Sequence, residues 1–119
     1  MLVLTRQAGE SVVINEWLVV TLANMSVFQV TVRIHASQPF YARTSADVET
    51  LANPYDNVEF TLRVNESVII DEEFSVVVVA AFSTGSQAKI RMGFEGPSST
   101  KLRCLDATGL AVKEFDFSK

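Results

Sequence analysis

Four arginines stand at positions where their side chains could bind an anion. Arg6, Arg43, Arg63 and Arg103 each interrupt a short stretch of mostly apolar or small residues. A guanidinium group carries forked donors that fit a carboxylate, a phosphate or the edge of an unstacked base. Taken by itself, an arginine on a strand is more often solvated or paired with an acid, and this chain has 14 acidic residues. The role of the four arginines therefore depends on the elements that position them.

The other reactive side chains form no pattern that predicts catalysis. His35 is the only histidine, and no candidate nucleophile accompanies it in a motif. Cys104 is the only cysteine, and on a strand such a residue more often packs as a small hydrophobe. The acidic run 71–73 fits a solvated turn, because no His or Cys clusters with it to bind a metal. We expect no catalytic residue, no cofactor and no metal, and hence a protein that is not an enzyme.

An internal repeat supplies the elements that carry the arginines. Residues 5–16 align with residues 61–72 at a constant offset of 56, with six identical residues. Within this alignment Gly9 matches Asn65, and these two residue types best tolerate a positive φ in a tight turn. At an offset of 60, the triplet 42–44 aligns with 102–104, so each copy has an Arg in its last strand. Such self-similarity indicates a duplicated unit.

Runs of β-branched residues bounded by turn residues predict five strands in each copy. They cover about 2–7, 11–15, 17–24, 28–35 and 39–43 in copy 1, and about 58–63, 67–71, 73–81, 88–95 and 100–105 in copy 2. Thr44 or Ser45 is expected to cap a short helix over 46–51, which Asn53-Pro54 ends. After Cys104, alternating apolar and polar residues predict an extra strand or an extended arm.

The two copies are expected to share one core. Copy 1 spans 1–55 and copy 2 spans 56–119, and a chain of this length on its own buries too little surface to be stable. The composition, with 48% hydrophobic residues rich in Val and Ile, favours a globular all-β fold. The sequence therefore predicts one compact domain, built as a β-sandwich or barrel-like assembly with at most short helices.

Charge and location restrict the partners that the chain could have. The formal net charge of −4 does not favour a polyanion, so a nucleic-acid contact would need a local basic patch. No apolar run is long enough to span a bilayer, and the opening residues lack the pattern of a secretion signal. A single cysteine excludes an internal disulfide, and these features together favour the cytoplasm.

Two motifs resemble the CsrA/RsmA family of bacterial post-transcriptional regulators. Residues 1–6 read M-L-V-L-T-R and are followed by Gly9-Glu10-Ser11 and by Ile14, close to the family opening M-L-I-L-T-R-x-x-G-E-x-x-x-I. Residues 90–97 of copy 2 read I-R-M-G-F-E-G-P, similar to the family's V-R-I-G-x-x-A-P. The resemblance covers nearly all of copy 1 and copy 2 as far as about Asp106.

The resemblance implies a fold and an RNA-binding function. Family members are usually single units that form an interlocked homodimer, so this chain would be a covalent, monomeric version of that dimer. The family binds GGA-containing hairpin loops of mRNA or small regulatory RNA, often over a ribosome-binding site, and blocks translation. A protein antagonist is a further candidate partner. No membrane partner is expected, because no apolar run is long enough to span a bilayer.

The family's RNA surface pairs the first strand of one protomer with the last strand of the other. Carried over to this chain, the resemblance implies two sites. The first joins Leu4, Thr5 and Arg6 with Leu102, Arg103 and Cys104, and the second joins Thr61, Leu62 and Arg63 with Ala42, Arg43 and Thr44.

This sequence departs from the family pattern at both sites. The family's last strand has V-H-R before a pair of acids, so Arg43 and Arg103 are either shifted by one position or replace the His. A shift of one residue in a strand moves a side chain to the other face. Copy 2 also has Leu62 where copy 1 has Arg6. The two sites should therefore be unequal, with Leu4–Arg6 and Arg103 forming the stronger one.

Two functions remain in view after these departures. The first is a CsrA-like regulator that holds a GGA loop and keeps the ribosome off the transcript. The alternative is a CsrA-like module that has lost RNA binding and engages a protein partner through exposed strand edges. The acidic net charge and the altered arginine pattern favour the alternative, whereas the two family motifs favour RNA.

Overall fold

The computed structural model describes residues 1–26, 29–44, 49–84 and 87–118, and these residues form strands and turns. The strands are β1 (Leu2–Gln7), β2 (Ser11–Ile14), β3 (Leu18–Met25), β4 (Val30–Ala36), β5 (Phe40–Thr44), β6 (Thr50–Ala52), β7 (Val58–Leu62), β8 (Ser67–Ile70), β9 (Phe74–Thr84), β10 (Gln87–Glu95), β11 (Lys101–Leu105) and β12 (Ala111–Asp116). The ten strands expected from the sequence are all present, most of them within two residues of the expected bounds. Over the described ranges, no helix has the length and apolar character needed to cross a membrane.

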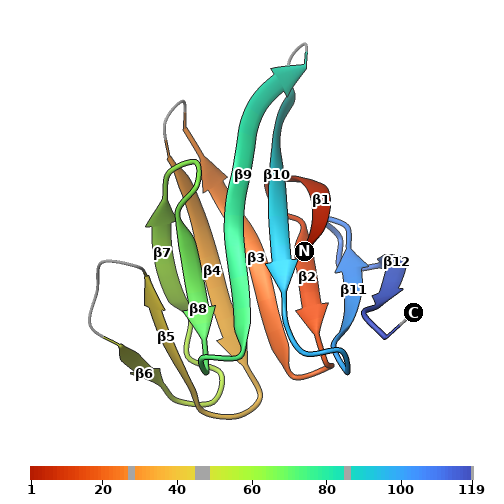
Figure 1. Cartoon of the computed structure of the whole chain (residues 1–119). Helices are drawn as coiled ribbons and strands as arrows, with labels where there is room; N and C mark the ends of the chain where they lie inside the picture. Colours follow the sequence, from red (N-terminus) through yellow and green to blue (C-terminus); the bar gives the residue numbers. More distant parts are fainter. Residues whose placement is uncertain (27–28, 45–48, 85–86, 119) are drawn as a thin grey trace.

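Both sheets contain strands from both copies of the repeat. Sheet A has the order β1-β10-β9-β8-β5-β6, and sheet B has the order β12-β11-β2-β3-β4-β7. Every neighbouring pair is antiparallel. The central strands of each sheet come from one copy, and the other copy supplies its first and last strands at the two sides (Figure 1). The expected interleaving of the two copies is therefore confirmed.

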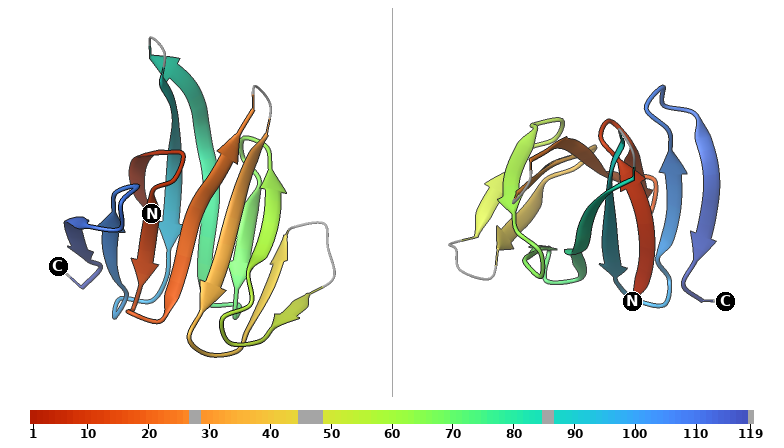
Figure 2. Two further views of the ribbon diagram at one scale, coloured as in Figure 1. Left: turned by 180° about the vertical axis from the view of Figure 1, so that it is seen from behind. Right: turned by 90° about the horizontal axis from the view of Figure 1, so that it is seen from above.

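The two sheets pack face to face as a sandwich and do not close into a barrel (Figure 2). In strands such as β3 and β4, side chains buried in the sandwich alternate with side chains on the outer face, which is the period-2 pattern of a half-buried strand. The largest fully buried side chains are Phe40, Phe94, Ile14, Leu18, Leu22, Ile34, Leu62, Ile70, Ile90, Met92, Leu102 and Val12. The core thus draws on both copies, and neither half has a core of its own.

Equivalent hydrogen bonds recur at the offset of the repeat. The N–H of Gly9 donates to the carbonyl of Leu22 at 2.8 Å, and the N–H of Asn65 donates to that of Val78 at 2.7 Å. The φ angles of Gly9 and Asn65 are 90° and 74°, as their alignment predicts. The two halves are therefore related by an internal pseudo-symmetry that reaches individual backbone groups.

A second set of equivalent bonds joins one copy to the other. The N–H of Asn15 donates to the carbonyl of Lys101 at 2.9 Å, and the side-chain oxygen of Asn15 accepts from the N–H of Lys101 at 2.8 Å. Asp71 makes the same two contacts with Tyr41, both at 2.8 Å. Both acceptor residues lie in turns with positive φ, where Asn and Asp are the tolerated residue types.

The segment after β5 corrects one expectation from the sequence. The predicted helix over 46–51 is wrong for its last two residues, because Thr50 and Leu51 belong to β6, which pairs with Phe40–Ala42 of β5. The expected helical positions 46–48 and the candidate cap Ser45 lie outside the described residues. Pairing with β5 satisfies backbone groups of that strand and buries Ala52, which outweighs local helix propensity.

The expected strand in the C-terminal tail is confirmed as β12, which pairs with β11 as β6 pairs with β5.

Candidate functional site

The first strand of copy 1 lies beside the last strand of copy 2. β1 ends sheet A, β11 is the second strand of sheet B, and the views of Figure 2 place them next to each other. A Cβ added to Gly9, just after β1, would lie 3.4 Å from Ala107, just after β11. The strands that the sequence assigned to the first site are therefore neighbours, although they belong to different sheets.

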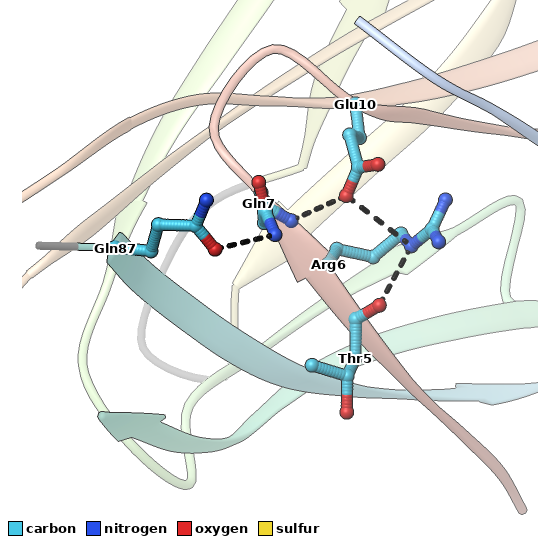
Figure 3. A network of polar contacts seen from close by, with 5 residues as sticks. All are labelled: Thr5, Arg6, Gln7, Glu10 and Gln87. Carbon is cyan, nitrogen blue, oxygen red and sulfur yellow. Dashed lines mark hydrogen bonds and ion pairs between the residues drawn. The ribbon is translucent and has the colours of Figure 1, made fainter. Parts of the chain in front are cut away.

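Arg6 points toward the interior of the sandwich at this place. It shares a face of β1 with the partly buried Leu2 and Leu4, and only 16% of its side chain is exposed. Its Nε donates to the carbonyl of Thr5 at 2.9 Å and lies 3.8 Å from a carboxylate oxygen of Glu10 (Figure 3). Its Nη1 is buried and makes no hydrogen bond. A ligand could reach this donor only if the Arg6 side chain or its neighbours moved.

Cys104 is an inward-facing residue of β11, close enough to Arg6 to feel its charge. Its side chain is 2% exposed and belongs to the core. Burial raises the pKa of the Cys104 thiol, and the positive charge of Arg6 offsets this only in part. The thiol is therefore protonated at neutral pH and acts as a small hydrophobe, as expected from the sequence.

Arg103 points the opposite way, to the outer face of sheet B. Its neighbours Leu102 and Cys104 are buried, so alternation turns the guanidinium group away from the core. There it holds Glu16 with two bonds, Nε to Oε1 at 3.1 Å and Nη2 to Oε2 at 2.8 Å. Arg6 and Arg103 thus lie on neighbouring strands but on different sides of sheet B, and they do not converge.

Arg43 repeats this arrangement in the second half. It bonds both carboxylate oxygens of Glu72, at 2.5 and 2.9 Å. These contacts hold the pKa of Glu16 and of Glu72 below the usual range and raise the pKa of both arginines. All four groups lie at the surface, where an ion pair stabilises the fold only slightly and exchanges easily.

The remaining residues assigned to the sites divide into buried and accessible ones. The side chains of Ala42, Leu62 and Leu102 are 1%, 1% and 2% exposed, so they serve the core and cannot touch a ligand. Thr5 and Thr61 are exposed at equivalent positions of β1 and β7.

In the second half, Arg63 is the more exposed of the two arginines assigned to the site. It is exposed just after β7 and lines a groove of about 660 Å³ together with Val64, Gln29 and Ala81. Thr44 is half-buried at the end of β5 and corresponds to Cys104. Leu62 fills the position of Arg6 in the second half, so the two halves differ in charge at this inward-facing position.

Two of the four strands assigned to the sites have both of their edges paired with neighbouring strands. β6 covers the side of β5, and β12 covers the side of β11, so the backbone groups there are already paired. β1 and β7 are the terminal strands of their sheets. Of the strands assigned to the sites, these two keep an open edge that could bond an extended ligand.

Sequence reasoning missed Glu16 and Glu72, the acidic partners of Arg103 and Arg43. Both follow an Asn or Asp at the offset of 56, and both lie opposite an arginine that repeats at the offset of 60. Combining the two offsets would have indicated the pairs. In the described ranges, no three His, Cys, Asp or Glu side chains gather closely enough to hold a metal ion.

Comparison with known proteins gives no relative from which a function could be taken. No family model, no curated protein and no solved structure matches the chain.

Proposed function

We propose that this protein is a CsrA-like RNA-binding regulator, which holds a GGA-containing hairpin loop of an mRNA and thereby blocks translation. The observation that carries the proposal is the interleaving of the two copies, with β1 of copy 1 beside β11 of copy 2. This is the arrangement that the resemblance implies for an RNA surface. The intact chain alone would form it, without a second subunit.

The open edge of β1 is suited to an unstacked base. Its outward-facing Thr5 offers a hydroxyl group, and the edge backbone offers donors and acceptors that could read a base edge. The unpaired Nη1 of Arg6 would become a further donor if RNA binding drew the buried side chain toward the open edge. On the outer side, a phosphate could replace the exposed carboxylate of Glu16 on Arg103, because the ion pair costs little to break.

A gel-shift titration tests this function. The probe is a hairpin with GGA in its loop, compared with the same hairpin carrying another loop sequence. The wild type should prefer the GGA loop, and Arg6→Ala or Arg103→Ala should weaken binding about tenfold, as expected for the loss of a specific arginine contact. Glu16→Gln should tighten binding, since it removes the carboxylate that competes for Arg103.

Arg33→Ala is the matched control for these variants. Arg33 also lies on the outer face of sheet B and is paired with a carboxylate, that of Glu59 at 3.0 Å, but outside the site. It should bind the GGA hairpin as the wild type does. Absence of a preference for GGA in the wild type at low salt, where phosphate contacts are strongest, would overturn the proposed function.

A protein-binding module is the second candidate function. It is favoured by the acid pairing of both Arg43 and Arg103 and by the apolar side chains on the outer face of sheet A. Among these, Val3, Tyr41 and Leu51 are 43%, 48% and 54% exposed. A partner would add a strand to the edge of β1 and cover Val3.

Val3→Lys separates the two functions. A lysine on an edge strand opposes the addition of another strand but adds a cation. If the chain binds a protein partner through β1, this variant should lose the partner. If the chain binds RNA there, the variant should retain or strengthen binding to the GGA hairpin.

A further inference from the structure

A cationic stripe lies on the outer face of sheet A, next to the open edge of β1. In the register of β10 with β1, Arg91 is opposite Thr5 and Lys89 is opposite Gln7. Arg91 and Lys89 share the outer face, because Ile90 between them is buried in the core. The amide of Gln7 also bonds that of Gln87 at 3.3 Å, so polar side chains of the two strands line one surface (Figure 3).

A β-bulge brings an aromatic ring to the same surface. The pairing of β9 with β10 shifts between Arg91, which is opposite Ala80, and Met92, which is opposite Val78. Val79 is the extra residue, and its insertion moves every following side chain of β9 to the other face. Phe82, which would otherwise continue the inward series of Val76 and Val78, therefore lies on the outer face. The guanidinium carbon of Arg91 is 5.3 Å from the centre of its ring.

The charges of this stripe are not neutralised by neighbouring acids. Within the described residues, neither Lys89 nor Arg91 forms an ion pair, whereas Arg33, Arg43 and Arg103 all do. The nearest acid on the same face of β10 is Glu95, four residues from Arg91 and so about 13 Å away along the strand. This is a local basic patch on a chain whose net charge is −4.

Only one half of the molecule has the stripe. At the repeat offsets, the positions of Phe82, Lys89 and Arg91 are occupied in copy 1 by Ser26, Gln29 and Thr31. The bulge itself is shared, because β3 and β4 shift their register between Leu22 and Asn24. The two copies therefore share the backbone, but copy 2 alone has the cationic and aromatic side chains of the stripe. The stripe lies beside the site that contains Arg6.

We propose that this stripe, Phe82, Lys89 and Arg91, binds the single-stranded part of an RNA that flanks the loop held at β1. The inference extends the proposed function and rests on it for the choice of RNA as ligand. Lys89 and Arg91 contact successive phosphates, and Phe82 with the stacked Arg91 provides a surface for a base. The stripe reads no sequence, and it makes binding directional because copy 1 has no counterpart.

Two probes separate this inference from the proposed function. One is an unstructured pyrimidine 12-mer RNA, and the other is the compact GGA hairpin without single-stranded flanks. The double variant K89A/R91A should bind the 12-mer about tenfold more weakly than the wild type. The dependence of log affinity on log salt should fall by about 1.4, because each phosphate contact on a single strand contributes about 0.7. Binding of the compact hairpin should be unchanged.

Lys113→Ala is the matched control. Lys113 is also exposed, and its ammonium group lies 5.2 Å from the ring centre of Phe115, but on β12. This variant should bind the 12-mer as the wild type does, and the conservative K89R/R91K variant should retain binding. Unchanged thermal midpoints for all variants show that the fold is intact.

Each outcome decides one of the two proposals. If the wild type does not bind the 12-mer, or if K89A/R91A binds it equally well, the stripe is not an RNA surface, whatever the hairpin does. If the hairpin shows no preference for GGA but the 12-mer binding is lost in K89A/R91A, the stripe stands and the proposed loop recognition fails. A single-stranded DNA of the same sequence shows whether the ribose hydroxyl groups contribute.

Discussion

At the scale of single residues, the two copies differ most at the position of Arg6. Copy 2 has Leu62 there, which is 1% exposed and packs in the core. Arg6 occupies the same place in the backbone with a guanidinium group whose Nη1 has no hydrogen-bond partner. A buried unpaired donor costs about 1–3 kcal/mol, so the arginine is not there for stability.

Replacement of Arg6 by its counterpart should therefore stabilise the fold and impair binding. We expect Arg6→Leu to raise the free energy of unfolding by about 1–2 kcal/mol, because it removes the unpaired donor and buries apolar surface. Affinity for the GGA hairpin should fall about tenfold. Urea unfolding and the gel shift measure the two effects, and a lower stability would show that Arg6 is a structural residue.

The paired glutamates make stability depend on pH. The pKa of Glu16 and Glu72 is lowered in the folded state by Arg103 and Arg43, so both contribute stability above their unfolded pKa. This contribution is lost as the pH falls through the lowered folded pKa. The urea midpoint should drop between about pH 5 and about pH 3, and less in Glu16→Gln/Glu72→Gln than in the wild type. An equal drop in the variant would assign the effect to other carboxylates.

At the scale of elements, the turns that follow β1 and β7 fix how each copy begins. Gly9 and Asn65 both have positive φ and make equivalent bonds to β3 and β9. The positive φ at this turn is therefore common to both copies, and two different residue types, Gly and Asn, adopt it.

This equivalence gives a test with an internal control. Gly9→Ala places a Cβ on a residue with φ of 90°, which should cost about 1–3 kcal/mol of unfolding free energy. Gly9→Asn copies the residue that copy 2 uses and should cost less. Space does not explain such a difference, because a Cβ at Gly9 would meet Ala107 at an ordinary 3.4 Å. Equal losses of unfolding free energy in the two variants would mean that the added side chain, and not the positive φ, causes the destabilisation.

At the scale of the whole molecule, the covalent link between the copies replaces a subunit interface. Each sheet takes its central strands from one copy and its flanking strands from the other. Separate halves would leave apolar faces exposed, whereas linking them raises the effective concentration of each for the other.

Cutting the chain at the junction should make folding depend on concentration. We expect fragments 1–55 and 56–119 to be unfolded as dilute monomers and to regain strand structure when mixed or concentrated. The intact chain should unfold with a midpoint that does not change with concentration, and circular dichroism measures both. Independent folding of fragment 56–119 as a monomer would contradict the shared core.

The sequence by itself determined the strands and their duplication. Runs such as 76–79 and the turn at Gly9 act locally, because β-branched residues fit a pleated strand and Gly accepts a positive φ. The exchange of first and last strands between the copies was implied by the resemblance to the CsrA/RsmA family and not by the repeat alone. The strands and their duplication need only short-range chemistry and a repeat to be visible.

The tertiary structure decided where the side chains of the arginines go and what they meet. Arg6 faces inward and Arg103 outward because of the register of strands that are distant in the sequence, and Glu16 reaches Arg103 across two copies. The bulge at Val79 moved Phe82 to the outer face, and pairing with β5 made residues 50–52 a strand. Each of these outcomes depends on hydrogen bonds between segments that are far apart in the chain. The free energy of these bonds exceeds the local propensity of the residues, and a short stretch of sequence does not reveal which segments will pair.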